Sequence, residues 1–217
     1  MSQKYKLLVF DWDGTLMDSA AEIVHCFQSA AAALGLPPPA AAAVHDIIGL
    51  GMREAVARLF PELAGEDFER LIAAYRRFYF DPQRPPAELF EGARELIEQL
   101  ARRDYLLAVA TGKGRRGLDR ALARTGLDRL FHMSRCVDEA HSKPHPQMLL
   151  DIMDSLGAEP AETLMIGDTE YDLQMAANAG AHGLAVCCGA HGRARLQAQR
   201  PVAILEHTRE LGDWLEA

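Results

Sequence analysis

The chain has 217 residues, 49% of them hydrophobic and 25% charged, which is typical of a globular protein built as one domain or as a core with a smaller insertion. A formal net charge of −8 argues against nucleic acid binding, which needs a basic face, but is compatible with a small anionic substrate held by local cations. The four cysteines lack zinc-site spacing, and no stretch approaches the ~18 apolar residues of a membrane span, so we expect reduced thiols and no membrane partner.

The first structural signal along the chain is a short apolar run at residues 7–10, directly before Asp11. Such a run suits a strand that is buried on both faces, as in a parallel sheet. It is also shorter than the apolar region of a secretory signal peptide. Together with the reduced cysteines, this predicts a cytoplasmic protein.

Residues 19–81 show helical periodicity and no convincing strand. The segment Ser19-Ala-Ala-Glu22 has the spacing of a capping box, which predicts a helix that begins there and runs to about Leu34. Two further helical patterns follow, over residues 52–59 and 68–79. These patterns predict an all-helical insertion.

After the insertion, strands and helices alternate. Apolar runs at residues 105–110, 163–166 and 183–187 predict buried strands. Helical spacing predicts one helix at residues 93–100, before the first of these runs, and another at residues 149–156, between the first and the second. This alternation predicts an α/β fold with a doubly wound, mostly parallel, Rossmann-like sheet.

The two patterns together predict the domain organisation. Residues 1–17 and 86–217 would form an α/β core, and residues 18–85 a helical cap inserted after the first strand. Prolines at positions 82, 85 and 86 suit the linker that returns from the cap to the core.

Two carboxylates, Asp11 and Asp13, follow the first predicted strand and precede Gly14. Because ligands bind at the carboxyl ends of the strands in open α/β sheets, both can face one pocket. One carboxylate can attack phosphorus while the other transfers protons. Carboxylates this close need a cation if both are to stay ionised.

Other predicted strand ends carry groups that complement a phosphate. Thr111 and the amide of Gly112 can hold phosphate oxygens, and Lys143 can neutralise the phosphate and the nucleophile together. Asp168 follows another strand and can bind magnesium, a hard cation that prefers oxygen ligands. Asp172 falls in the first turn of the next helix, where the helix dipole favours its charge.

Each of these residues also has a simpler interpretation. An Asp-Gly pair is usually a turn, Asp168 and Asp172 could cap a helix, and Lys143 could be a solvated surface lysine. Several such motifs, in order and each at a strand end, favour the functional interpretation.

The ordered set resembles the haloacid dehalogenase superfamily, which consists mostly of phosphatases, over residues 7–187. Its motifs are matched in order by Asp11-Trp-Asp-Gly-Thr15, by Thr111, by Lys143, and by Asp168 with Asp172. The helical insertion is similar to the cap of the phosphoglycolate phosphatase subgroup.

The resemblance implies a magnesium-dependent phosphatase that passes through an aspartyl-phosphate. Asp11 would be the nucleophile and Asp13 the general acid and base. Asp11, the backbone carbonyl of Asp13, and Asp168 would bind Mg²⁺, with Asp172 orienting its waters or Lys143. Thr111, Gly112 and Lys143 would share the charge on the phosphoryl oxygens. The implied substrate is a small phosphorylated metabolite, with phosphoglycolate as the model. The sequence does not indicate how many copies of the chain assemble.

Two other functions remain open. A sugar phosphomutase of the β-phosphoglucomutase kind shares the core and the cap, but returns the phosphoryl group to a sugar. A binding or regulatory protein could keep the fold and lose catalysis, although the complete acidic set argues against it.

Arg53 is a candidate for substrate binding. It follows the glycine-bearing loop of Gly49 and Gly51 and falls in the first turn of a predicted helix, where a cation opposes the helix dipole. Its partner could be a nearby acid such as Glu54 or Asp46. It could instead be a distal anionic group of the substrate, as a matching arginine in cap loops of related phosphomutases suggests by resemblance.

The eight histidines form no pair with metal-ligand spacing and a supporting acid. We therefore expect them, His191 included, at the surface or at the rim of the pocket.

Overall fold

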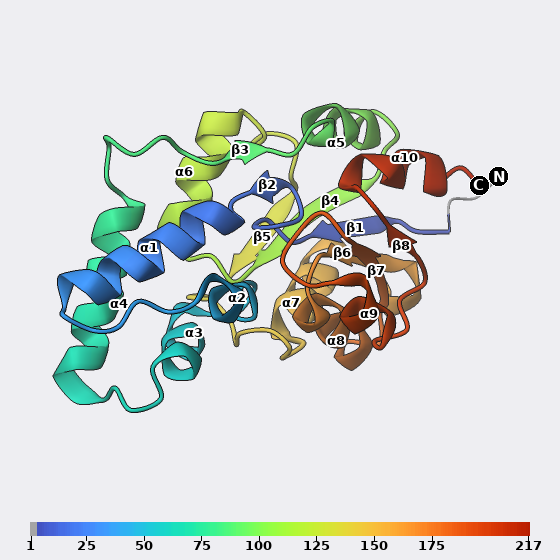
Figure 1. Ribbon diagram of the computed structural model, residues 1–217. Helices are drawn as coiled ribbons and strands as arrows, with labels where there is room; N and C mark the ends of the chain where they lie inside the picture. Colours follow the sequence, from blue (N-terminus) through green and yellow to red (C-terminus); the bar gives the residue numbers. More distant parts are fainter. Residues whose placement is uncertain (1–3) are drawn as a thin grey trace.

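The computed structural model describes residues 4–217. Six parallel strands form its main sheet, in the order β5-β4-β1-β6-β7-β8, and helices cover both faces (Figure 1). The strands are β1 (Leu7–Phe10), β4 (Leu106–Thr111), β5 (Met133–Cys136), β6 (Thr163–Gly167), β7 (His182–Val186) and β8 (Ile204–Leu205). The predicted fold class is confirmed.

Strand β1 is central and pairs with β4 on one side and β6 on the other. Its side chains alternate between the two faces of the sheet, so Leu8 and Phe10 join one apolar cluster while Leu7 and Val9 join another. All four side chains are completely buried, which explains why the strand reads as an uninterrupted apolar run.

The helices of the core form two layers. The layer over Leu8 and Phe10 contains α5 (Ala93–Ala101), α6 (Arg115–Thr125) and α10 (Leu211–Trp214). The layer over Leu7 and Val9 contains α7 (Gln147–Leu156) and α8 (Glu170–Asn178). Short helix α9 (Arg193–Gln197) packs near β7, and two 3₁₀ turns occur at Pro160–Glu162 and Thr208–Glu210.

Residues between the first and second strands of the sheet form the helical insertion. It contains α1 (Ala20–Ala33), α2 (Ala41–His45), α3 (Met52–Leu59) and α4 (Gly65–Tyr79), which lie beside one end of the sheet (Figure 1). These helices share their own apolar cluster, centred on buried residues such as Phe27, Val56 and Leu71. All lie within the range predicted for the cap, and the exact boundaries at 17/18 and 85/86 stay a prediction.

The two chain segments that connect the core to the cap form a short two-stranded sheet, which the sequence analysis did not predict. Strand β2 (Met17–Asp18) runs antiparallel to β3 (Glu88–Leu89). Strand β5 was also missed, because three of its four residues are only half-buried at the edge of the sheet and do not form an apolar run.

Within residues 4–217, no helix combines the length and the apolar character needed to cross a bilayer.

Candidate active site

The predicted site residues converge because parallel strands end at the same edge of the sheet. Asp11 follows β1, Thr111 ends β4, and Asp168 follows β6, so three adjacent strands supply them. Lys143 comes from the loop between β5 and α7, and Asp172 from the first turn of α8. At most 1% of each residue is exposed.

Lys143 binds two of the carboxylates. Its Nζ lies 2.8 Å from Asp11 Oδ1 and 2.6 Å from Asp172 Oδ1. Burial lowers the pKa of the Lys143 ammonium, but the charges of these carboxylates outweigh that effect and raise it overall. Lys143 therefore remains charged at any physiological pH.

Asp11 has one restrained oxygen and one free oxygen. Its Oδ1 also accepts a hydrogen bond from the Trp12 amide at 2.7 Å. Its Oδ2 is buried without a hydrogen-bond partner among residues 4–217. Burial raises the pKa of Asp11 well above the usual aspartate value, although Lys143 opposes that rise. A buried carboxylate oxygen without a partner is suited to bind a cation or to attack an electrophile.

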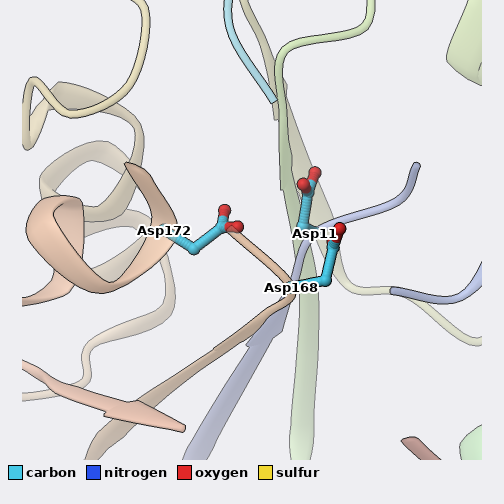
Figure 2. A group of neighbouring side chains, drawn as sticks. All are labelled: Asp11, Asp168 and Asp172. Carbon is cyan, nitrogen blue, oxygen red and sulfur yellow. The ribbon is translucent and has the colours of Figure 1, made fainter. Parts of the chain in front are cut away.

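Asp11, Asp168 and Asp172 form an acidic cluster (Figure 2), with one oxygen of each within 4.8 Å of the others. Burial, followed by the charge of Asp172, raises the pKa of Asp168 to about 7. Three buried carboxylates therefore face the single ammonium group of Lys143. A divalent cation would balance the remaining negative charge, so the donor set fits a hard metal ion.

Asp168 is held in place from several sides. Its Oδ1 accepts a hydrogen bond from Thr15 Oγ1 at 2.7 Å, and its Oδ2 accepts one from the Ala190 amide at 2.8 Å. A Cβ at Gly14 would lie 2.2 Å from Asp168 Oδ2, and a Cβ at Gly189 would lie 2.1 Å from it. Only glycine fits at these two positions, so the backbone itself fixes this carboxylate.

Asp172 is oriented by the start of its own helix. Its Oδ2 accepts hydrogen bonds from the Thr169 amide at 3.1 Å and from Thr169 Oγ1 at 2.6 Å. The interaction with the helix N-terminus leaves Oδ1 directed to Lys143. Thr169 is the N-cap of α8.

The side chain of Asp13 binds Lys113, to which the sequence analysis gave no role. Lys113 Nζ lies 2.8 Å from Asp13 Oδ1 and 2.7 Å from Oδ2, and both side chains are about nine-tenths buried. Ser19 Oγ donates a third hydrogen bond to Asp13, at 2.7 Å. Metal binding by Asp13 would therefore use its backbone carbonyl, as the resemblance implied.

The prediction that Ser19 and Glu22 form a capping box is wrong. The Ser19 hydroxyl forms no cap hydrogen bond in α1, because it donates to the Asp13 carboxylate, and Glu22 pairs with Arg84. A hydrogen bond to a charged acceptor is stronger than one to a backbone group. The helix still begins at the predicted position.

Thr111 and Gly112 lie where the core meets the cap. Thr111 Oγ1 accepts a hydrogen bond from the Lys113 amide at 3.1 Å, which leaves its proton available for a phosphate oxygen. A Cβ at Gly112 would lie 2.5 Å from the Gly49 carbonyl oxygen and 2.6 Å from that of Leu50. Glycine at position 112 therefore permits the cap loop to close over the site.

The family model of haloacid dehalogenase-like hydrolases matches residues 8–186. The chain belongs to this family. A protein from Dickeya dadantii (strain 3937), named "Probable phosphatase IndB", is 37% identical over 92% of this chain and 89% of its own length. The pyrophosphatase PpaX of Bacillus cereus (strain AH820) is 30% identical over 96% of this chain and 95% of its own length.

Solved structures also place the chain close to phosphatases of this family. The crystal structure of a predicted phosphoglycolate phosphatase from Haemophilus somnus 129pt is 25% identical, with a TM-score of 0.88 and coverage of 99% of each chain. The recognition of a phosphatase of the haloacid dehalogenase superfamily is thereby confirmed. Enzymes of this superfamily generally use a divalent metal, and the acidic cluster could bind one.

In this phosphatase, a cavity of about 400 Å³ lies between core and cap. Its core side includes Asp11, Asp13, Thr111 and Gly112. Apolar side chains from the helical insertion make up much of the remaining lining. The arrangement gives a charged catalytic end and an apolar compartment.

The structure does not bring Arg53 into this cavity. Its guanidinium lies 2.7 Å from Glu69 and 5.1 Å from the ring centroid of Phe68, and 70% of its side chain is exposed. Arg53 is the second residue of α3, and Glu69 on the neighbouring helix α4 satisfies its charge. An acidic partner was one of the two expected outcomes, but it is neither Glu54 nor Asp46. The predicted substrate contact is absent from this arrangement.

His191 also departs from the expectation. Only 3% of the residue is exposed. Its Nδ1 accepts a hydrogen bond from the Glu170 amide at 3.0 Å, and its ring centroid lies 5.3 Å from that of Tyr171. Burial lowers its pKa, so the neutral form is favoured. This histidine supports the start of α8 from within the protein.

Proposed function

We propose that this phosphatase hydrolyses the phosphate monoester of a small metabolite in a Mg²⁺-dependent reaction with Asp11 as the nucleophile. The observation that carries the proposal is the asymmetry of Asp11. One oxygen is fixed by Lys143 and the Trp12 amide, while the other is buried, without a partner, beside the cavity. A fixed carboxylate with one free oxygen is preorganised for in-line attack.

The reaction proceeds in two steps. In the first, an Asp11 oxygen bonds to phosphorus, the bond from phosphorus to the ester oxygen breaks, and Asp13 gives a proton to the departing alkoxide. In the second, Asp13 takes a proton from water, whose oxygen attacks the aspartyl-phosphate and releases inorganic phosphate and the Asp11 carboxylate. Thr111, Gly112 and Lys143 hold the phosphoryl oxygens during both steps, as expected for phosphoryl transfer.

The hydrogen bonds of Asp13 suit this role. As a carboxylate it accepts bonds from Lys113 and Ser19, which fix its orientation at the edge of the cavity. This is the form that accepts a proton from water in the second step. Lys113 is therefore a positioning residue for Asp13.

The residues that would hold Mg²⁺ are Asp11, Asp168 and the backbone carbonyl of Asp13. Their oxygen donors match the preference of this ion, and the charge of the acidic cluster supports a divalent cation. When bound, Mg²⁺ would neutralise negative charge on the phosphoryl group. Asp172 would act indirectly, because its oxygens bind Lys143 and Thr169.

The other functions considered from the sequence are less well supported. The arginine expected to hold the second anion of a phosphomutase substrate, Arg53, binds Glu69 instead. A protein without catalysis would have no need of a complete acidic set with a free nucleophilic oxygen. Release of inorganic phosphate without a bisphosphate activator would separate hydrolysis from the mutase reaction.

The test uses Asp11→Asn, which preserves size but cannot attack phosphorus. Phosphate release from a panel of phosphate monoesters with Mg²⁺ should disappear. Intact-mass spectrometry should detect a phosphoryl adduct on wild type after rapid acid quench, but none on the variant. Asp154→Asn, an exposed carboxylate on α7, is the matched control and should retain activity. Wild-type turnover by Asp11→Asn would refute the proposal.

A further inference from the structure

The cavity contains an aromatic wall that the proposed reaction does not require. Phe27 of α1 packs against Tyr75 of α4 with ring centroids 4.5 Å apart. Tyr75 stacks on Tyr79 at 6.1 Å with an interplanar angle of 7°, and Tyr79 meets Phe80 edge-on at 5.1 Å. All four residues line the cavity, so a continuous series of rings extends through the cap side.

Aliphatic side chains complete the apolar compartment. Ile47, Ile48 and Leu50, from the loop between α2 and α3, line the same cavity, as does Met52 at the start of α3. A volume of about 400 Å³ lies within the range of roughly 300–1,000 Å³ that holds drug-sized ligands. A two-carbon leaving group such as glycolate would leave most of this space to water.

The charges around the cavity are divided between buried and exposed positions. Lys113 is committed to Asp13, and its Nζ also lies 4.8 Å from the ring centroid of Tyr79. Arg76 and Arg116 are exposed lining residues that form no ion pair within residues 4–217, and Arg116 lies over Phe80 at 4.4 Å. A distal anion of the substrate could pair with these exposed arginines, whereas an anion placed against the buried apolar lining would lack a partner, which is costly.

We infer that the preferred substrate is a phosphate monoester whose leaving alcohol carries an aromatic ring. This inference rests on the proposed function, because the ring occupies the same cavity while the phosphate meets Asp11. Aromatic rings pack favourably in offset or edge-on geometry, which the series of rings in the wall offers. The inference narrows the substrate class and replaces phosphoglycolate as the model.

The experiment compares kcat/KM for three monoesters of primary alcohols, measured as phosphate release with Mg²⁺. Benzyl phosphate carries a ring, cyclohexylmethyl phosphate has similar bulk without aromaticity, and ethyl phosphate has neither. The three leaving groups are chemically similar at the ester oxygen. Differences in kcat/KM therefore report how the rest of the leaving group binds in the cavity. We expect benzyl phosphate to exceed ethyl phosphate and phosphoglycolate by about tenfold or more, from burial of the ring, with cyclohexylmethyl phosphate between them.

A pair of variants at the end of α4 assigns the preference to the wall. Phe80→Leu keeps an apolar side chain but removes a cavity ring, and should lower the ratio of kcat/KM for benzyl to that for ethyl phosphate by about threefold or more. Phe78→Leu is the matched control, because Phe78 is half-buried in the same region and does not line the cavity. Its ratio should equal that of wild type. A ratio measured within each variant is insensitive to partial loss of folded protein.

Each outcome distinguishes the two proposals. If ethyl phosphate, phosphoglycolate and benzyl phosphate react equally well, or cyclohexylmethyl phosphate matches benzyl phosphate, the aromatic inference is wrong and the phosphatase proposal stands. An unchanged ratio in Phe80→Leu would also overturn the inference. If no ester releases phosphate faster with wild type than with Asp11→Asn, the proposed function fails and the inference fails with it.

Discussion

The core side and the cap side of the cavity use their charged residues in opposite ways. On the core side, charges face the cavity and bind one another, as Lys143 binds Asp11 and Lys113 binds Asp13. On the cap side, Arg53 binds Glu69 on the exposed surface, and apart from the exposed Arg76, rings and aliphatic chains face the cavity. The core is therefore built to stabilise transferred charge, and the cap to exclude water and contact the body of the substrate.

This difference predicts how variants will behave. Changes on the core side remove charge from a buried network of ion pairs and hydrogen bonds, so their effects on turnover should be large. Changes to the exposed charges of the cap remove weak interactions, so their effects should be small.

The largest expected effect comes from removing the metal. EDTA should abolish phosphate release and added Mg²⁺ should restore it, because the acidic cluster lacks a balancing charge without a cation. Calcium should inhibit, since its larger and more flexible coordination suits in-line transfer poorly. Asp168→Ala should weaken the rescue, which a Mg²⁺ titration of activity would measure. Full activity in excess chelator would contradict the prediction.

A smaller but still large effect is expected at Asp13. Asp13→Asn should slow turnover by about 10²–10⁴-fold, the usual contribution of general acid–base catalysis. Phosphorylation of Asp11 by substrates with good leaving groups should persist, so mass spectrometry should detect a long-lived phosphoenzyme. Lys113→Met removes the partner of Asp13 and should lower kcat in the same direction. An unchanged kcat in Asp13→Asn would exclude its role in proton transfer.

The core side was also the more predictable one. Asp11, Thr111, Lys143, Asp168 and Asp172 could be found from sequence because each lies at or just beyond the carboxyl end of a strand, or near the start of a helix. Parallel strands bring such positions together without any knowledge of side-chain contacts. The motif order then indicated the family that the comparisons confirmed.

The contacts that sequence analysis missed join distant positions. Lys113 and Asp13 are 100 residues apart, and their ion pair forms because the adjacent parallel strands β1 and β4 end at the same edge of the sheet. Arg53 and Glu69 are 16 residues apart on different helices, so a search among the nearest acids could not find the pair. Ser19 was misassigned because its local spacing matched a cap, while a stronger acceptor lay outside its helix.

A further prediction concerns the contact between cap and core on the side of α9. Arg195 lies 2.6 Å from Asp46 of the cap and 2.6 Å from Glu170 of the core, and Tyr171 donates a hydrogen bond to the Asp46 carbonyl at 2.8 Å. Asp46→Ala should loosen the closed arrangement and raise KM a few-fold at most, because an exposed pair contributes only about 0–1 kcal/mol. Asp67→Ala, a similarly exposed acid paired with Arg70 inside α4, is the control and should leave KM unchanged. A larger change in the control would mean that cap stability, and not closure, sets KM.

The smallest effect is expected for Arg53→Ala. The Arg53–Glu69 pair is 70% and 57% exposed, so its loss should cost less than about 1 kcal/mol of stability. Its position outside the cavity lining predicts kcat and KM within about twofold of wild type, since about 0.4 kcal/mol corresponds to that factor. Arg76→Ala is the informative comparison, because Arg76 is an exposed arginine of the same cap that lines the cavity. If Arg53→Ala instead raised KM tenfold while Arg76→Ala had no effect, substrate binding would have to move α3 and release Arg53 from Glu69. The separation of charged core from apolar cap would then hold only for the substrate-free protein.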